Sequence, residues 1–197
     1  MSAGLHPEGF IRLLAAVALL AAWLVQADAQ TDGDAAARAQ RLDSLFALLK
    51  TAKDQDEADA IVGDIWKVWL RSGSADLDAR MEHATRLMAH GLLQPALAAL
   101  DEITAAAPKW AEAWNKRATV LFLLSEYDRS LADIERVLAL EPRHFGALAG
   151  IGMIRSEKGE LREALAALRR ALAVNPFLKE RLGLIPALEK QLGEQPL

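Results

Sequence analysis

The stretch that decides the fold is Leu131-Ala-Asp-Ile-Glu-Arg-Val-Leu-Ala-Leu-Glu-Pro142, because it recurs along the chain. It returns as Leu165-Ala-Ala-Leu-Arg-Arg-Ala-Leu-Ala-Val-Asn-Pro176, with 6 of the 12 positions identical. The earlier stretch 97–108 also shares 6 of 12 positions with the last one, and the three stretches are evenly spaced. Self-similarity at a fixed period of about 34 residues predicts an array of stacked repeats.

Each repeat has the apolar spacing of two short helices joined by a turn. In the middle repeat, Trp114, Ala118 and Leu121 follow one helical stripe, and Leu131 and Ile134 belong to a second. A polar segment separates the two stripes, and a proline follows the second one, where it cannot continue that helix. Alanine and leucine dominate the composition, which favours helices over strands. The sequence therefore predicts an all-α fold of antiparallel helix pairs.

These repeats resemble the tetratricopeptide repeat (TPR), a helix-turn-helix unit of the same period. The matching units are residues 77–110, 111–144 and 145–178. Small residues stand in each unit where that pattern brings two helices close together, namely Ala84, Ala118 and Gly152. The resemblance implies a right-handed superhelical solenoid whose concave groove is lined by the first helix of each pair.

The pattern is broken at Arg80, His83 and Arg117, where it asks for apolar residues. The helical stripe places Arg117 near the core, so its side chain should need an acidic partner or extend to water. Two interpretations stay open for Arg117: a local ion pair, or a polar contact to an anion that faces the groove.

The segments that flank the repeats are predicted to cover the ends of the solenoid. Residues 38–76 resemble a degenerate helical hairpin that would form an N-terminal cap, and residues 30–37 before it are expected to be disordered. Residues 179–193 are amphipathic and resemble the solvating helix that ends proteins of this family. Pro186 within them should kink or restart the helix.

The N-terminus has the features of a secretory signal peptide over residues 1–29. Arg12 precedes an unbroken apolar run over 13–25, too short for a typical membrane-spanning helix, and Ala27-Asp28-Ala29 offers a small-x-small cleavage site. This pattern predicts a periplasmic protein of a bacterium. The alternative is an uncleaved helix that anchors the chain in the inner membrane with its remainder facing the periplasm.

Composition and motifs argue against several classes of function. The net charge is −4, and no basic face is evident, so a nucleic-acid partner is not expected. The chain has no cysteine, and it lacks the known nucleophile, zinc-protease and phosphate-loop motifs. We therefore expect no enzyme activity, no cofactor, no metal site and no small-molecule substrate.

The predicted function is that of an interaction adaptor that binds a peptide or helix of another envelope protein. By repeat geometry, the side chains that would face the groove and contact the partner are Met81, Thr85, Met88, Asn115, Thr119, Phe122, Met153 and Ser156. The three methionines could instead pack between repeats. Chaperone-binding members of the family hold a peptide carboxylate with Lys and Asn, but Met81 and Thr85 stand at two of those positions, so that activity is not expected here. The alternative function is a membrane-tethered assembly or scaffold factor that uses the uncleaved N-terminal helix.

Overall fold

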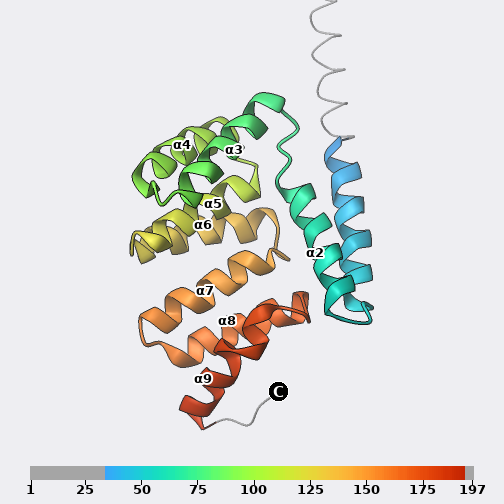
Figure 1. The fold of residues 1–197 in the computed structure, drawn as a ribbon, viewed down its shortest axis with the longest axis vertical. Helices are drawn as coiled ribbons and strands as arrows, with labels where there is room; N and C mark the ends of the chain where they lie inside the picture. The colour runs from blue at the N-terminus through green and yellow to red at the C-terminus, as the bar shows by residue number, and fades with distance from the viewer. Residues whose placement is uncertain (1–33, 194–197) are drawn as a thin grey trace, which may run out of the picture. The chain divides into compact units, whose positions relative to one another are not determined.

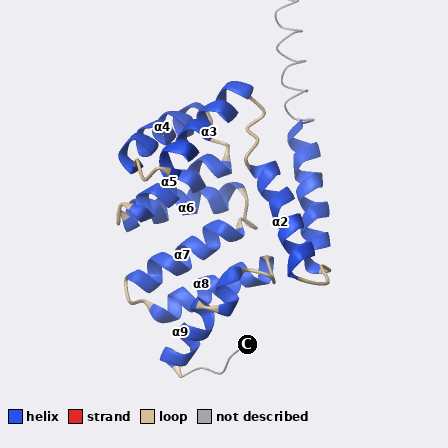
Figure 2. Cartoon of the chain, in the orientation of Figure 1, coloured by secondary structure: helices blue, strands red, loops and turns tan. Residues whose placement is uncertain are grey.

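The computed structural model describes residues 34–193 of the chain. Over this range the chain folds into helices and loops, without a β-strand (Figure 2). The first helix covers residues 34–50, and it begins inside the segment 30–37 that we expected to be disordered. That expectation is wrong for residues 34–37, where an alanine-rich stretch extends the helix toward the N-terminus. The predicted signal peptide over 1–29 lies outside the described residues.

The remaining helices belong to the compact unit that starts at Leu45. Their bounds are α2 Gln55–Trp69, α3 Ala75–Ala89, α4 Leu93–Ala106, α5 Ala111–Leu123, α6 Tyr127–Leu140, α7 Phe145–Glu157, α8 Leu161–Val174, a 3-10 turn η1 Lys179–Leu182 and α9 Leu184–Leu192. Each repeat thus contains one pair of helices, joined by a short turn.

Antiparallel helix pairs form the body of this unit. Helix α3 pairs with α4, α5 with α6 and α7 with α8, and the pairs stack as a right-handed superhelical solenoid (Figure 1). The loop after each pair closes in the same way. The backbone N–H groups of Trp110, His144 and Leu178 each donate to the carbonyl three residues earlier, at 3.0, 3.1 and 3.1 Å. These residues are one repeat apart, so the turn itself is part of the repeat.

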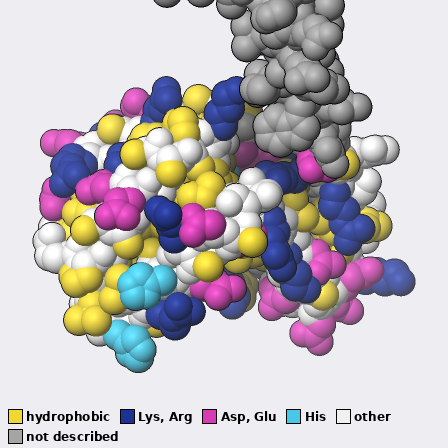
Figure 3. All heavy atoms as spheres, turned by 90° about the horizontal axis from the view of Figure 1, so that it is seen from above, with side chains coloured by type: hydrophobic (Ala, Val, Ile, Leu, Met, Phe, Trp, Pro, Cys, Tyr) yellow, Lys and Arg dark blue, Asp and Glu magenta, His cyan; other side chains and the backbone are white. Residues whose placement is uncertain are grey.

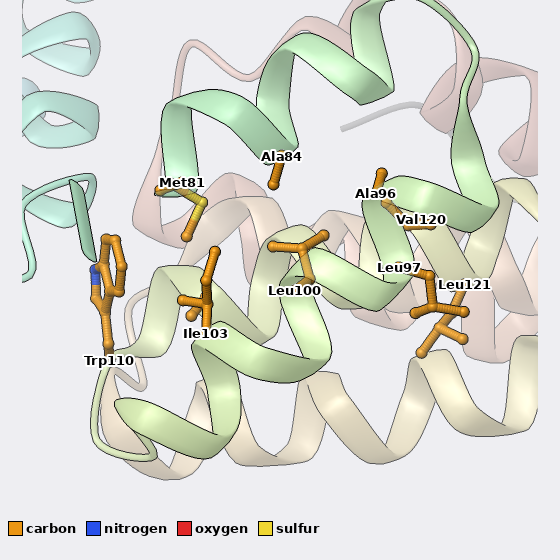
Figure 4. Close-up of a cluster of buried hydrophobic side chains, with 10 residues drawn as sticks. Met81, Ala84, Ala96, Leu97, Leu100, Ile103, Trp110, Val120 and Leu121 are labelled. Carbon is orange, nitrogen blue, oxygen red and sulfur yellow. The ribbon is translucent and has the colours of Figure 1, made fainter. Parts of the chain in front are cut away.

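The core between the helix pairs is aliphatic and closely packed. Leu97 of α4 lies beside Leu121 of α5, and Ile103 of α4 lies beside Met81 of α3, all in one buried cluster (Figure 4). In the third repeat, a Cβ added at Gly152 would lie 2.5 Å from Cγ of Leu168, so only glycine allows α7 and α8 to approach this closely. The small residue that the pattern demands is therefore explained by direct contact.

The turn between the two helices of each pair uses the left-handed backbone region. Gly91 and Gly159 have φ values of 71° and 74°, and Ser125 at the equivalent position has 61°. Glycine adopts this conformation without steric cost, whereas Ser125 is strained. The middle repeat therefore keeps the shared turn geometry with a residue less suited to it.

The two ends of the stack differ. Helix α9 covers α8 through buried Ile185 and Leu188, and Gly183 separates it from η1 so that it restarts before Pro186. At the other end, Arg80 and His83 lie exposed on α3. These two residues depart from the family pattern because their face of the first repeat has no preceding repeat to contact.

Helix α2 does not belong to the repeats but runs across one edge of the stack (Figure 1). Its Trp66 and Trp69 contact Phe145 at the start of α7, with ring centroids 5.6 and 5.2 Å apart. The indole Nε1 of Trp110, just before α5, donates to the carbonyl of Trp69 at 2.7 Å. Helix α2 is therefore anchored at the starts of α5 and α7.

Candidate functional site: the concave face of the repeats

The first helices of the three pairs, α3, α5 and α7, carry the residues that the sequence predicts to face a groove. Asn115, Thr119 and Phe122 of α5 meet Met153 of α7 around a narrow cavity of about 50 Å³. Gly150 of α7 lines the same cavity, and a Cβ added there would lie 3.2 Å from Cδ1 of Ile134 on α6. Four of the eight predicted contact residues thus come together.

Two of the other predicted residues lie in a second pocket of about 550 Å³, bounded by α3, α5 and the end of α2. Thr85 is exposed there, whereas Met81 is only 2% exposed and belongs mainly to the core. Met88 is half-buried against the same core, and Ser156 is half-buried on α7 about one turn beyond Met153. For Met81, packing between helices accounts for most of its surface.

The second pocket has a mixed, mainly basic lining. Its cationic side chains are Lys67, Arg71, Arg86 and Lys116, and its acidic ones are Asp78 and Glu82. Arg71 and Arg86 pair with these two acids at 3.5 and 3.7 Å. The exposed pair of Arg86 and Glu82 is weak, whereas Asp78 is half-buried and also accepts hydrogen bonds from the backbone N–H and the hydroxyl of Ser72 at 2.8 and 2.7 Å.

Arg117 makes a local network and does not face the groove. Its Nε and Nη2 donate to the two carboxylate oxygens of Asp133 on α6 at 2.8 and 2.7 Å. Its Nη1 donates to Asp101 at 2.9 Å and to Thr104 at 3.1 Å, both on α4. The hydrogen bond to Asp133 raises the pKa of the guanidinium above its ordinary value, so it stays charged. Of the two interpretations of Arg117, the local ion pair describes these contacts.

A wall formed by α2 is the part of the site that sequence reasoning missed. Trp66 lies so close to α7 that a Cβ added at Gly146 would be 3.0 Å from its ring. Gln55 at the other end of α2 donates to the carbonyl of Phe177 at 3.2 Å. Between these contacts lies a third pocket of about 610 Å³, shared by α2, α7 and the loop before η1.

The sequence contains a pattern that could have predicted the position of α2. Trp110, His144 and Leu178 occupy equivalent positions of successive repeats, and each is bulky. The structure places Trp110 and His144 against Trp69, and Leu178 in the pocket beside α2. A bulky residue at the same loop position in every repeat can indicate an element that crosses all of them.

A fully buried acid–histidine pair underlies this contact. His144 stacks on Trp69 with ring centroids 4.0 Å apart, and its Nδ1 accepts the N–H of Ala147 at 3.1 Å. The Nε2–H is then left to donate to Glu112, 3.1 Å away. Asn115 also donates to Glu112, at 2.9 Å, and Lys116 lies 3.6 Å from its other oxygen. Because Glu112 and His144 are wholly buried, a substrate cannot reach them.

The described part of the chain contains no group of three or more His, Asp or Glu side chains placed to hold a metal ion. Within the same residues, no helix is both long and apolar enough to span a bilayer. At the end of the stack that carries α3 and α4, acidic and basic side chains are interspersed with apolar ones (Figure 3).

Comparison with known proteins agrees with the repeat register. The tetratricopeptide repeat family matches residues 145–177, the third repeat. A TPR repeat-containing protein of Rhizobium etli is 43% identical over 137 residues, which cover 70% of this chain and 67% of the relative. The chain belongs to the TPR family. Proteins of this family are in general interaction modules without catalytic activity.

Solved structures show the same TPR fold at lower identity. The first TPR of Spaghetti (RPAP3), bound to the HSP90 peptide SRMEEVD, is 19% identical with a TM-score of 0.56, covering 60% of this chain and 94% of that one. The Sgt2 TPR domain from Aspergillus fumigatus is 14% identical with a TM-score of 0.57, covering 61% and 81%. The P58(IPK) TPR domain is 24% identical with a TM-score of 0.54, covering 60% and 34%.

Proposed function

We propose that this TPR protein is a non-catalytic adaptor of the bacterial cell envelope. It binds a peptide or helix of a partner protein on the concave face of α3, α5 and α7. The observation that carries this proposal is the convergence of Asn115, Thr119, Phe122 and Met153 on one cavity between α5 and α7. Larger pockets lie next to α3 and next to α7, and the one next to α7 shares Gly146 and Met153 with this cavity, so a bound segment would have contacts beyond it.

Two further facts support a protein ligand. The RPAP3 repeat, which shares this fold, is a peptide-binding protein in its solved complex. The side chains at the central cavity also combine an amide, a hydroxyl, an aromatic ring and a thioether. An amide or hydroxyl group can bond a peptide backbone, while Phe122 and Met153 adapt to apolar side chains of different shape.

The experiment that tests this function is photocrosslinking in living cells. A photoreactive amino acid replaces exposed Thr119 in the groove, and a matched variant carries it at exposed Glu102 on α4. We expect a discrete crosslinked protein from Thr119 and none from Glu102, identified by mass spectrometry. A product from Glu102 alone would move the binding surface to the outer helices and contradict the proposal.

The envelope location rests on the residue pattern over 1–29 and needs its own test. The intact mass of the protein isolated from the periplasm should be about 3 kDa below that of the full chain if the signal peptide is removed. A full-length protein that remains with the inner membrane would favour the second candidate, a membrane-tethered scaffold. A protein found in the cytoplasm at full length would contradict both.

A further inference from the structure

The pocket between α2 and α7 has a composition that specifies its ligand more closely than the rest of the groove. We call it the α2–α7 pocket, and its volume is about 610 Å³. Its apolar lining comes from α2, α7 and the loop before η1, and consists of Val62, Trp66, Phe145, Ala149, Met153, Phe177 and Leu178. Aromatic rings supply much of this lining, which suits a large apolar group.

Two glycines line this pocket, for different reasons. Gly146 on α7 leaves room for the Trp66 ring, since an added Cβ would lie 3.0 Å from it. Gly63 on α2 has no such reason, because a Cβ added there would meet nothing within 4 Å. Glycine inside a helix is less stable than alanine, so Gly63 weakens α2 without relieving any contact within the chain. What Gly63 preserves is space on the pocket side of α2.

The mouth of the α2–α7 pocket is acidic. Among the described residues, its charged lining consists of Asp59 of α2 with Lys179 and Glu180 of η1. Among the described side chains, neither acid lies within ion-pair distance of a cation; Asp59 accepts a hydrogen bond from Gln55 on its own helix at 2.9 Å. The pocket beside α3 differs, since its cations outnumber its acids. The two ends of the concave face therefore favour opposite charges.

We propose that the α2–α7 pocket takes a large apolar side chain of the partner protein, with a lysine or arginine at the next or next-but-one residue. The apolar side chain would lie between Trp66, Phe145 and Met153, while the cation would face Asp59 and Glu180. This inference rests on the proposed function, because it names the chemistry of the segment that the groove would hold.

The test selects ligands without assuming a partner. A phage library of random peptides of about twelve residues is panned on the protein isolated from cells that express the full chain. The same library is panned on Gly63→Leu, which fills the pocket, and on Ala60→Leu, a matched change at an exposed position of α2. Gly63→Leu should fold at least as well as the wild type, because leucine is the better helix former. A melting curve verifies this point.

We expect the wild type to enrich peptides with an aromatic residue, Leu or Met close to Lys or Arg. Their affinity should fall at least about tenfold in Gly63→Leu and stay unchanged in Ala60→Leu. Replacing both Asp59 and Glu180 by lysine should shift the selected flanking residues from basic to acidic. Selected peptides that bind Gly63→Leu as tightly as the wild type would overturn the proposal, and so would a selection that enriches no such motif.

Two other results would also overturn it while leaving the adaptor function testable. If the wild type sediments as a dimer and Gly63→Leu as a monomer, the occupant of the pocket is a second copy of this chain. If a partner crosslinks to Thr119 equally well in wild type and in Gly63→Leu, the groove binds a protein but the α2–α7 pocket is not its anchor. If the chain with the photoreactive residue at position 119 and no other change gives no crosslinked protein, that result counts against the proposed function.

Discussion

The repeat body and the α2 contact are held together by different chemistry. Within α3–α8, helices pack through aliphatic and small residues such as Leu100, Gly152 and Leu168, at positions that recur from repeat to repeat. Helix α2 is held by its indole rings and by the hydrogen bond from Trp110 to Trp69, and Trp69 stacks on His144, the buried partner of Glu112. The repeats tolerate exchange of one aliphatic residue for another of similar size, whereas the α2 contact depends on hydrogen-bond geometry. Substitutions of similar size should therefore disturb the repeat body less than they disturb the attachment of α2.

The largest expected effect comes from removing the ring at the centre of the α2 contact. Trp69→Ala should make the docking of α2 less favourable by about 4 kcal/mol, because Trp69 is buried and stacks on His144. Hydrogen exchange should accelerate over Gln55–Trp69 while α3–α8 stay protected. Lys67→Ala on the exposed side of the same helix is the control. Unchanged protection of α2 in Trp69→Ala would refute its role as the anchor.

The matching change in the repeat body should destabilise the whole solenoid. Leu168→Ala should reduce the free energy of unfolding by about 3 kcal/mol, since this fully buried side chain fills the space above Gly152. Denaturant unfolding measures the loss, and exposed Leu182→Ala should change little. Gly152→Ala should cost less stability in the Leu168→Ala background than in the wild type, because the 2.5 Å clash is gone and only the carbonyl oxygen of Ala164, 3.2 Å away, stays close. Equal costs in the two backgrounds would mean that α7 and α8 do not meet as described.

The buried polar pair gives a smaller and more diagnostic effect. Glu112→Leu should cost about 2 kcal/mol, because the Nε2–H of His144 and the amide of Asn115 lose their acceptor. Glu112→Gln keeps an acceptor of the same shape and should cost less than about 1 kcal/mol. Thermal unfolding of the two variants gives the difference. Equal losses would show that charge, and not the hydrogen bonds, is what matters at this position.

The smallest expected effect is an increase in stability. Gly63→Ala should raise stability by about 0.5–1 kcal/mol, because alanine favours the helix and the added Cβ meets nothing within 4 Å. The gain should appear in the melting temperature and in slower hydrogen exchange of α2. A loss of stability would contradict the open space beside Gly63. The α2 contact would then be tighter than the structure shows.

Much of the fold could be predicted because the same sequence pattern recurs in three repeats. Pro108, Pro142 and Pro176 mark the ends of the second helices and give the period, and the apolar spacing within each repeat predicts the helix pairs. The departures at Arg80 and His83 could be noticed but not explained, because their exposure depends on what lies beside α3.

The candidate site was predicted less completely. Repeat geometry brings Asn115, Thr119, Phe122 and Met153 to one cavity, since these positions share the inner face of α5 and α7. For Met81 it left open a groove contact or packing between repeats, and this side chain lies mainly in the core. For Arg117 it left two interpretations open, and the choice depends on Asp133 and Asp101, each 16 residues away in sequence. Contacts between separate elements have no periodic signature.

The sequence by itself therefore determined the all-α class, the period of the repeat and the family, because local periodicity and turn residues suffice for helix pairs that contact their neighbours. The tertiary structure alone decided where α2 lies, how Glu112 and His144 are buried together, and that an open apolar pocket with an acidic mouth borders α7. The physical reason is that these features arise from contacts between distant segments, such as Trp69 with His144, that occur once and follow no period.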